Sequence, residues 1–230
     1  MLTTKNTESC PYVISFDCPE LVEFSRKVYQ QFTDKSRLFF DQISDLVTKD
    51  NKQLILKKYG SNLMHNLFDG NNFALTKEKT KLLQEIIPDL SGVGYRMLYP
   101  PSYVGLPHID GLSTSKNLFQ YNLIVPIDNF EQTITRYYDP ELVTQDCLET
   151  ATQYLPEFKT LDSNSAIFSH TITKPTLFYN QHLHSATNHG DTNRSVIIWK
   201  FLKDTNLKEI IKNLIDHGKK IEYIYNYQEE

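Results

Sequence analysis

The sequence has few cysteines, no long apolar run and no strong excess of charge. Its 230 residues include three cysteines without CxxC spacing. Neither a disulfide framework nor a thiolate zinc site is therefore predicted, and a reducing cytoplasm is the expected location. No apolar stretch approaches the roughly 18 residues that a membrane span needs, and the N-terminus lacks the basic and apolar regions of a signal peptide. We expect a soluble chain without a membrane anchor.

The charged residues exclude a further class of function. The formal net charge is -4 at pH 7 with neutral histidine, and the basic residues are scattered instead of forming a run that could follow phosphates. Nucleic acid is therefore not expected as a partner, whereas a small-molecule or peptide substrate is. With 40% hydrophobic and 12% aromatic residues, the chain is long enough to form one domain with a substantial core.

The pattern of apolar residues changes near position 92. Residues 1–92 are expected to be mainly helical, because apolar side chains recur there at helical spacing over 21–32, 39–47 and 77–87. Short runs rich in β-branched and aromatic residues then predict strands, at 93–99, 118–127, 133–138, 166–172, 176–179 and 195–201.

Two further segments complete the expected organisation. Residues 139–163 are acidic and read as an insertion between strands. Residues 203–230 are expected to form a C-terminal helix, ended at Gly218, followed by a tail. The prediction is a single α+β domain over 1–230, in which residues 93–202 form a barrel or sandwich.

A candidate metal site begins at His108 and Asp110. The two residues stand two positions apart in a segment expected to be extended, so both side chains point to one face and can share a metal ion. A facial triad needs one more histidine from a neighbouring strand. His184 meets this need, just beyond the strand-like segment PTLFYN, and Arg194 follows at the start of another predicted strand. His182 is the alternative third ligand, because it shares a face with His184 on an extended chain.

A second His-x-Asp pair occurs at His189 and Asp191, and we reject it as a metal site. Only His217, on the predicted last helix, follows this pair, and no arginine follows Arg194. The pair therefore lacks both a third ligand on a strand and a cation for an acidic cosubstrate.

The chain resembles the 2-oxoglutarate and Fe(II)-dependent dioxygenase superfamily over about residues 93–201. The segment YRMLYPPSYVGLPHID is similar to the one that, in prolyl-hydroxylase-like members, leads from a cosubstrate-contacting tyrosine to the His-x-Asp pair. The segment HSATNHGDTNRSVIIWKF resembles the stretch from the third ligand to the cosubstrate anchor, and its spacing and Asn188 are similar to the aspartyl/asparaginyl β-hydroxylase branch. The resemblance implies a double-stranded β-helix core of the jelly-roll, cupin-like type.

The resemblance also implies roles for individual residues. His108, Asp110 and His184 would bind Fe(II) and form the catalytic centre. Arg194 would hold the distal carboxylate of 2-oxoglutarate, and Tyr99 would contact the same cosubstrate.

The chain departs from the family pattern beside the arginine. Prolyl-hydroxylase-like members often carry a serine two residues after the arginine, whereas here Ser195 adjoins Arg194. On a strand, Ser195 should therefore face away from the cosubstrate. In the family alignment Gln120 and Asn122 point inward. We expect these amides either to bond the cosubstrate in place of the serine or to bond main chain or water inside the barrel.

The implied activity is hydroxylation of an unactivated C–H bond by O2, with 2-oxoglutarate converted to succinate and CO2. Because Asp110 is present, hydroxylation is favoured over halogenation. Two alternatives stay open: a cupin-type metal enzyme that does not use 2-oxoglutarate, and a non-catalytic binding module. An acidic lid at 139–163 would suit a neutral or cationic substrate, such as an amino acid, a peptide or an amine-bearing metabolite. Other aromatic residues are expected to line the pocket (Tyr95, Tyr103, Tyr179) or to lie in the core or barrel wall (Trp199).

Overall fold

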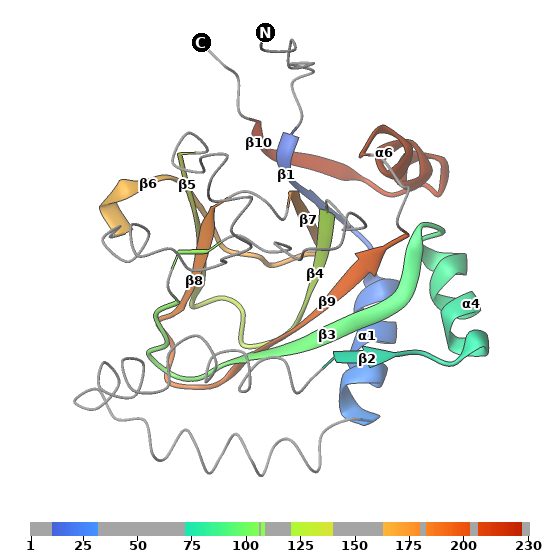
Figure 1. The fold of residues 1–230 in the computed structure, drawn as a ribbon, viewed down its shortest axis with the longest axis horizontal. Helices are drawn as coiled ribbons and strands as arrows, with labels where there is room; N and C mark the ends of the chain where they lie inside the picture. The colour runs from blue at the N-terminus through green and yellow to red at the C-terminus, as the bar shows by residue number, and fades with distance from the viewer. Residues whose placement is uncertain are drawn as a thin grey trace, which may run out of the picture.

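Two antiparallel β-sheets and three helices make up the described part of the chain (Figure 1). The computed structural model describes residues 11–31, 72–105, 107–108, 121–139, 163–179, 183–202 and 207–226. Within these ranges the protein has mixed α+β architecture, as predicted. The arrangement is a β-sandwich that is compatible with a jelly-roll core.

The larger sheet has seven strands, all paired antiparallel. Their order across the sheet is β10 (Ile221–Asn226), β1 (Pro11–Phe16), β7 (Thr176–Tyr179), β4 (Tyr121–Asp128), β9 (Arg194–Phe201), β3 (Leu90–Tyr99) and β2 (Asn72–Ala74). The smaller sheet has the order β6 (Ala166–His170), β5 (Thr133–Tyr138) and β8 (His184–Asn188), and a 3-10 turn at Ser163–Ser165 precedes β6. Val104 and His108 extend this smaller sheet through isolated bridges to β8.

The three helices lie on the side of the larger sheet away from the smaller one (Figure 1). They are α1 (Pro19–Gln31), α4 (Lys77–Ile86) and α6 (Leu207–Asp216). Thr76 caps α4, because its side chain accepts a hydrogen bond from the Lys79 backbone N–H. Gly218 ends α6 at φ 72°, where its N–H and that of Lys219 bond back to Ile215 and Leu214, as in a Schellman motif. No helix in the described ranges is long and apolar enough to cross a membrane.

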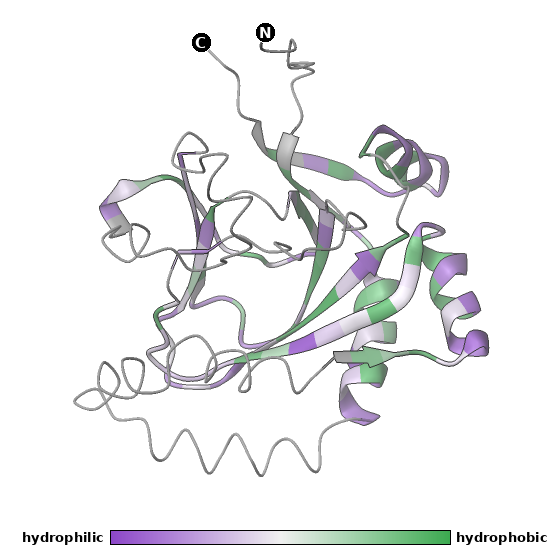
Figure 2. Ribbon diagram, viewed as in Figure 1, coloured by the Kyte–Doolittle hydropathy of each residue, from purple (hydrophilic) through white to green (hydrophobic). Residues whose placement is uncertain are grey.

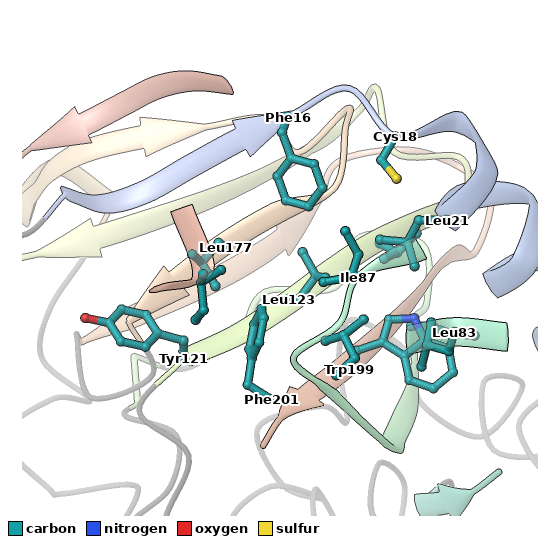
Figure 3. Packing of buried hydrophobic residues seen from close by; sticks show 14 of the residues in the cluster. Phe16, Cys18, Leu21, Leu83, Ile87, Tyr121, Leu123, Leu177, Trp199 and Phe201 are labelled. Atoms are coloured by element: carbon teal, nitrogen blue, oxygen red, sulfur yellow. The ribbon is translucent and has the colours of Figure 1, made fainter. Parts of the chain in front are cut away.

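A helix-side core fills the space between these helices and the larger sheet. Figure 3 shows Trp199 and Leu123 of the sheet packed among residues of α1 and α4, and Figure 2 shows the apolar faces that meet there. Trp199 is fully buried, its Nε1–H donates to Ser25 Oγ at 2.9 Å, and the Phe73 ring meets it edge-on at 5.3 Å. Trp199 is therefore core, as expected.

A second, inter-sheet core lies between the two sheets. Its buried members are Val13, Tyr99, Tyr103, Ile124, Tyr137, Ile172, Phe178, Ala186, Val196 and Ile198. Alternation along β9 divides that strand between the two cores: Val196 and Ile198 belong to the inter-sheet core, and Ile197 belongs to the helix-side core. Residues of even number on β9, including Arg194, therefore face the smaller sheet.

The predicted strands are largely confirmed, with corrections at both ends of the chain. The runs 133–138 and 176–179 match β5 and β7 in their bounds, and 77–87 matches α4 to within a residue. The expectation of a mainly helical region over 1–92 is wrong at β1 and β2, which are strands of the larger sheet, and the expected C-terminal tail contains β10. The predicted helix at 39–47 and the body of the predicted insertion, residues 140–162, lie outside the described residues.

Candidate metal and anion site

His108 and His184 lie directly opposite each other on neighbouring extended segments. The backbone N–H of each donates to the carbonyl oxygen of the other at 2.9 Å, which makes a hydrogen-bonded antiparallel pair. Side chains of such a pair project from the same face, and the two ring centroids are 4.6 Å apart. His184 is buried and His108 partly so. The fold thus brings together two predicted ligands that are far apart in the sequence.

The approach of the His108 segment to β8 requires a glycine. Gly105 donates its N–H to the Ala186 carbonyl oxygen at 2.8 Å, and a Cβ at position 105 would lie only 2.7 Å from that oxygen. Any larger residue would push this segment away from β8. Gly105 therefore sets the spacing on which the histidine pair depends.

Asp110, His182 and Gln120 lie outside the described residues. Among the described residues no three His, Cys, Asp or Glu side chains form a metal-binding group, so the structure places two of the three predicted ligands.

Aromatic rings surround His184 on the inter-sheet side. The Phe178 ring meets the His184 ring edge-on, with the ring centroids 5.1 Å apart. Tyr137 is the register partner of His184 on β5, and the centroids of their rings are 6.3 Å apart. Both rings are almost fully buried. They limit the rotation of His184 and exclude water from that side of the ring. Sequence analysis missed both residues.

Arg194 is buried in the same interior, with 2% of its surface exposed. Its Nε–H has no hydrogen-bond partner among the described residues, and no Asp or Glu in that part of the chain is buried. Its guanidinium carbon lies 4.9 Å from the centroid of the Tyr99 ring, its register partner on β3. Burial lowers the pKa of Arg194, and Tyr99 and Tyr137 only partly offset this effect. Arginine nevertheless stays charged in proteins, so this cation has no buried carboxylate beside it among the described residues.

Tyr137 connects the histidine pair with Arg194. It is opposite His184 on the neighbouring strand, and its phenol interacts electrostatically with both Arg194 and Tyr99. Burial raises the pKa of Tyr137, so its hydroxyl is neutral at physiological pH and can donate a hydrogen bond. Burial alternates over Thr133, Thr135 and Tyr137, but two of these residues are polar, so the sequence TITRYY alone does not mark the inner face.

Asn188 organises the turn that joins the two sheets beside Arg194. Its side-chain amide N–H groups donate to the carbonyl oxygens of Tyr99, Pro100 and Thr192 at 2.8 to 3.1 Å, and its amide oxygen accepts from the Gly190 N–H at 3.0 Å. The side chain is buried. Asn188 thus ties the end of β3 to the β8–β9 turn, where Tyr99 and Arg194 pair.

Three neighbouring residues lie away from this interior. Ser195 faces α1, as expected, where its hydroxyl lies 2.9 Å from that of Tyr29, so it points away from Arg194's side of the sheet. His189 and Asp191 are exposed in the β8–β9 turn, and the rejection of that pair as a metal site stays a prediction.

Other predicted pocket residues differ in where they face. Asn122 lies on the inner face of β4, as expected, but its amide oxygen accepts a hydrogen bond from Lys200 Nζ at 2.6 Å. Tyr99 donates its hydroxyl to Met97 Sδ at 3.4 Å. Tyr95 and Tyr103 pack in or against the inter-sheet core, whereas Tyr179 packs against the helix-side core.

Comparisons with known proteins give only distant likenesses. No family model matches the chain, and no curated protein matches it. A non-heme monooxygenase, solved as the ThoJ-Ni complex, has a TM-score of 0.40 and 10% identity, covering 84% of this chain and 72% of that one. A prolyl-4-hydroxylase from Pseudomonas putida has a TM-score of 0.30 and 10% identity, covering 54% and 62%. Both are too distant to define a family or to assign a residue.

Proposed function

We propose that this chain is an Fe(II)- and 2-oxoglutarate-dependent dioxygenase that uses O2 to hydroxylate a C–H bond of a small molecule, an amino acid or a peptidyl residue. The observation that carries the proposal is the buried Arg194, whose Nε–H has no hydrogen-bond partner among the described residues, in the same interior as the facing His108 and His184. A buried, unmatched cation is costly unless a ligand neutralises it. The distal carboxylate of 2-oxoglutarate is suited to that role.

The donor set fits iron(II) in its chemistry. Two imidazoles that project from facing positions, together with the carboxylate of Asp110 two residues after His108, make the 2-His-1-carboxylate set typical of non-heme iron oxygenases. Such a set leaves metal positions for a 2-oxo acid and for O2. When bound, the iron supplies the activation of O2 and the oxidation of 2-oxoglutarate to succinate and CO2.

The strand order supports the same proposal. One sheet contains β3, β9, β4 and β7 in adjacent positions, and the other contains the bridge at His108 followed by β8, β5 and β6. Chain order alternates between these two groups of four at every step except from β5 to β6, which are consecutive in the smaller sheet, and this order is typical of a double-stranded β-helix. We propose that architecture for residues 93–202, with the whole chain as a single domain.

The chain's own residues would position the cosubstrate and keep its surroundings dry. Arg194 offers a planar fork of N–H donors that matches a carboxylate. The Tyr99 ring supports the guanidinium from one side, and the Tyr137 hydroxyl is a neutral donor in the same interior. Val196 and Ile198 of β9 line the same face with apolar groups. Gln120 and Asn122 stay predicted cosubstrate contacts.

The test separates metal binding, cosubstrate binding and turnover. Fe(II) is titrated into the protein without oxygen, 2-oxoglutarate is then added in a calorimeter, and succinate is measured after O2 is admitted. Arg194→Ala should keep iron affinity and lose 2-oxoglutarate affinity by about 100-fold, because a charge-assisted pair is removed. Arg194→Lys should recover little of the lost 2-oxoglutarate affinity, because lysine lacks the planar set of N–H donors. Arg26→Ala, at a partly exposed arginine of α1 outside the site, is the control.

Each failure points to a different alternative. Iron binding without 2-oxoglutarate binding would indicate a cupin-type metal enzyme with another cosubstrate. Failure to bind iron would indicate a non-catalytic binding module. Unchanged 2-oxoglutarate affinity in Arg194→Ala would refute the anchor.

A further inference from the structure

Strand β9 offers no polar side chain next to Arg194 on its inner face. The next residue on that face is Val196, which is fully buried in the inter-sheet core. Ser195, between the two, points toward α1. A carboxylate held by Arg194 must therefore receive any further hydrogen bond from another strand.

Asn122, one of the two amides predicted to bond the cosubstrate, lies at another level of the larger sheet. It is the register partner of Lys200, six residues beyond Arg194 on β9. At about 3.3 Å per residue, the two levels are about 20 Å apart along the strand. Asn122 is therefore not placed to share one carboxylate with Arg194.

Thr135 of β5 carries a hydroxyl on the inner face of the smaller sheet. It stands two residues before Tyr137, a member of the inter-sheet core, so strand alternation directs both side chains to the same face. Its register partner on β8, Ala186, belongs to the same core. Thr135 is only 4% exposed. Its hydroxyl is therefore enclosed between the two sheets.

The Thr135 hydroxyl makes no hydrogen bond within the part of the chain that the structure describes. Its register partner on β6, His170, does not bond it, and the His170 Nε2 atom is itself buried without a partner among the described residues. Thr133 and Thr176, two other buried threonines on the inner faces, differ from Thr135. Both donate to main-chain carbonyl oxygens, at 2.6 and 2.9 Å respectively. An enclosed hydroxyl without a partner costs free energy, which a hydrogen-bonding ligand would offset.

Contacts across the sheets place Thr135 at a level that the Arg194 side chain spans. The main chain of Arg194 pairs with that of Tyr99, and the Tyr99 carbonyl oxygen accepts a hydrogen bond from Asn188. Asn188 is in register with the residue two positions before Thr135. The Arg194 guanidinium interacts electrostatically with Tyr137, two positions after Thr135. The Arg194 side chain therefore extends across the level of the Thr135 hydroxyl.

We propose that the Thr135 hydroxyl donates a hydrogen bond to the carboxylate that Arg194 holds, so that one anion is bound from both sheets. This inference rests on the proposed function, in which that anion is the distal carboxylate of 2-oxoglutarate. A threonine hydroxyl can donate to a carboxylate oxygen, and its bond to a charged group is stronger than one to a neutral group. Thr135 is thus assigned as a specificity-determining residue, which favours 2-oxo acids that carry a second carboxylate.

The experiment measures binding without turnover, with two ligands that differ only at the distal end. Protein loaded with Mn(II) is titrated in a calorimeter, without oxygen, with 2-oxoglutarate and with 2-oxopentanoate, in which a methyl group replaces the distal carboxylate. The wild-type protein should bind 2-oxoglutarate more tightly. The ratio of the two dissociation constants is then compared between variants.

Substitutions at Thr135 should change this ratio through one ligand only. Thr135→Val keeps the shape of the side chain and removes the hydroxyl. Affinity for 2-oxoglutarate should fall about tenfold or more, because a hydrogen bond to a charged group is lost. Affinity for 2-oxopentanoate should stay within about threefold of the wild-type value. Thr135→Ser keeps the hydroxyl and should keep the ratio within about threefold.

Thr176→Val is the matched control, at a buried threonine on the inner face of β7. Its hydroxyl already donates to the Lys174 carbonyl oxygen and lies 2.8 Å from that of Ser15, so the ratio should not change, whereas resistance to urea should fall. In ligand-free Thr135→Val, resistance to urea should not fall, because that hydroxyl has no bond to lose. Circular dichroism checks that each variant is folded.

Three outcomes overturn the inference and leave the proposed function intact. The first is that folded Thr135→Val keeps the wild-type ratio. The second is that it loses affinity for both ligands equally, which would indicate a structural role. The third is that it is less stable than the wild-type protein without ligand, which would show that the hydroxyl is bonded within the chain. Failure of the metal-loaded wild-type protein to bind 2-oxoglutarate would instead overturn the proposed function itself.

Discussion

Arg194 and Tyr99 face each other across β9 and β3, with the guanidinium carbon 4.9 Å from the centre of the ring. The electron-rich face of the ring attracts the cation, and such a cation–π contact stabilises by about 0.5 to 2 kcal/mol. The cost of removing an unmatched charge from water is several kcal/mol. Arg194 should therefore lower the free energy of unfolding of the ligand-free protein, and a substitution that removes the charge measures the sign of this effect.

Replacing Arg194 with methionine should stabilise the ligand-free protein. Arg194→Met keeps the length of the side chain and removes the buried charge, so the free energy of unfolding should rise by about 1 to 3 kcal/mol. Urea unfolding of the metal-free protein measures this change. Addition of 2-oxoglutarate with metal should stabilise the wild-type protein and not the variant. A less stable ligand-free variant would show that the charge is already compensated within the chain.

Removing either histidine of the facing pair should weaken metal binding. Loss of groups that merely support ligands reduces metal affinity by about 10- to 100-fold, so loss of a ligand in His108→Ala or His184→Ala should cost about 100-fold or more. Equilibrium dialysis with Fe(II) or Mn(II) measures the change. His189→Ala, at an exposed histidine of the β8–β9 turn, should bind metal normally. If His184→Ala kept its affinity while His182→Ala lost it, His182 would be the third ligand.

A methyl group at Gly105 should disturb the same pair from the backbone side. Gly105→Ala places a Cβ 2.7 Å from the Ala186 carbonyl oxygen, so the 104–108 segment must move away from β8. Metal affinity should fall by about tenfold or more, although no ligand is changed. As a control, Gly218→Ala should lower stability through its positive φ of 72° and leave metal affinity unchanged. Normal metal affinity in folded Gly105→Ala would show that the histidines do not depend on this approach.

Ser195 should matter for stability and not for the cosubstrate. Its hydroxyl bonds that of Tyr29 on the helix side of the sheet, so Ser195→Ala should cost about 1 kcal/mol of unfolding free energy. The 2-oxoglutarate affinity should be unchanged within about twofold. Calorimetric titration and urea unfolding on the same preparation give both values, and a selective loss of cosubstrate affinity would place the hydroxyl in the site.

The sequence predicted the strands that show a strand-like residue pattern by themselves. It missed β1 and β8, whose burial depends on their neighbours in the sheets. Residues 13–16 of β1, VISF, are buried on both faces of the sheet, with Val13 toward the smaller sheet and Ile14 toward the helices, so they show no period-two alternation. The β8 segment HSATN is polar yet buried. Its Ser185 and Thr187 hydroxyls are paired with Tyr138 and Arg136, respectively, a pairing that only the folded sheet provides.

The same distinction applies to the candidate site. His108, His184 and Arg194 were selected from residue type and order, because metal ligands and anion anchors come from few residue types, and their roles stay predictions. Tyr137 and Phe178 were missed, because their places depend on cross-strand register, which a single sequence does not encode in its spacing. The sequence singled out Asn188 only through the family resemblance. That its side chain holds the β8–β9 turn follows from its four hydrogen bonds in the structure.

The turn that Asn188 clamps has a consequence for how this protein can diversify. His184 and Arg194 are only ten positions apart, on the two strands that this turn joins, and the turn carries the chain from one sheet to the other. An insertion or deletion between them would alter the separation of the proposed metal ligand from the proposed anion anchor in a single event. Relatives of this chain that share the proposed function should therefore keep the length of that turn fixed.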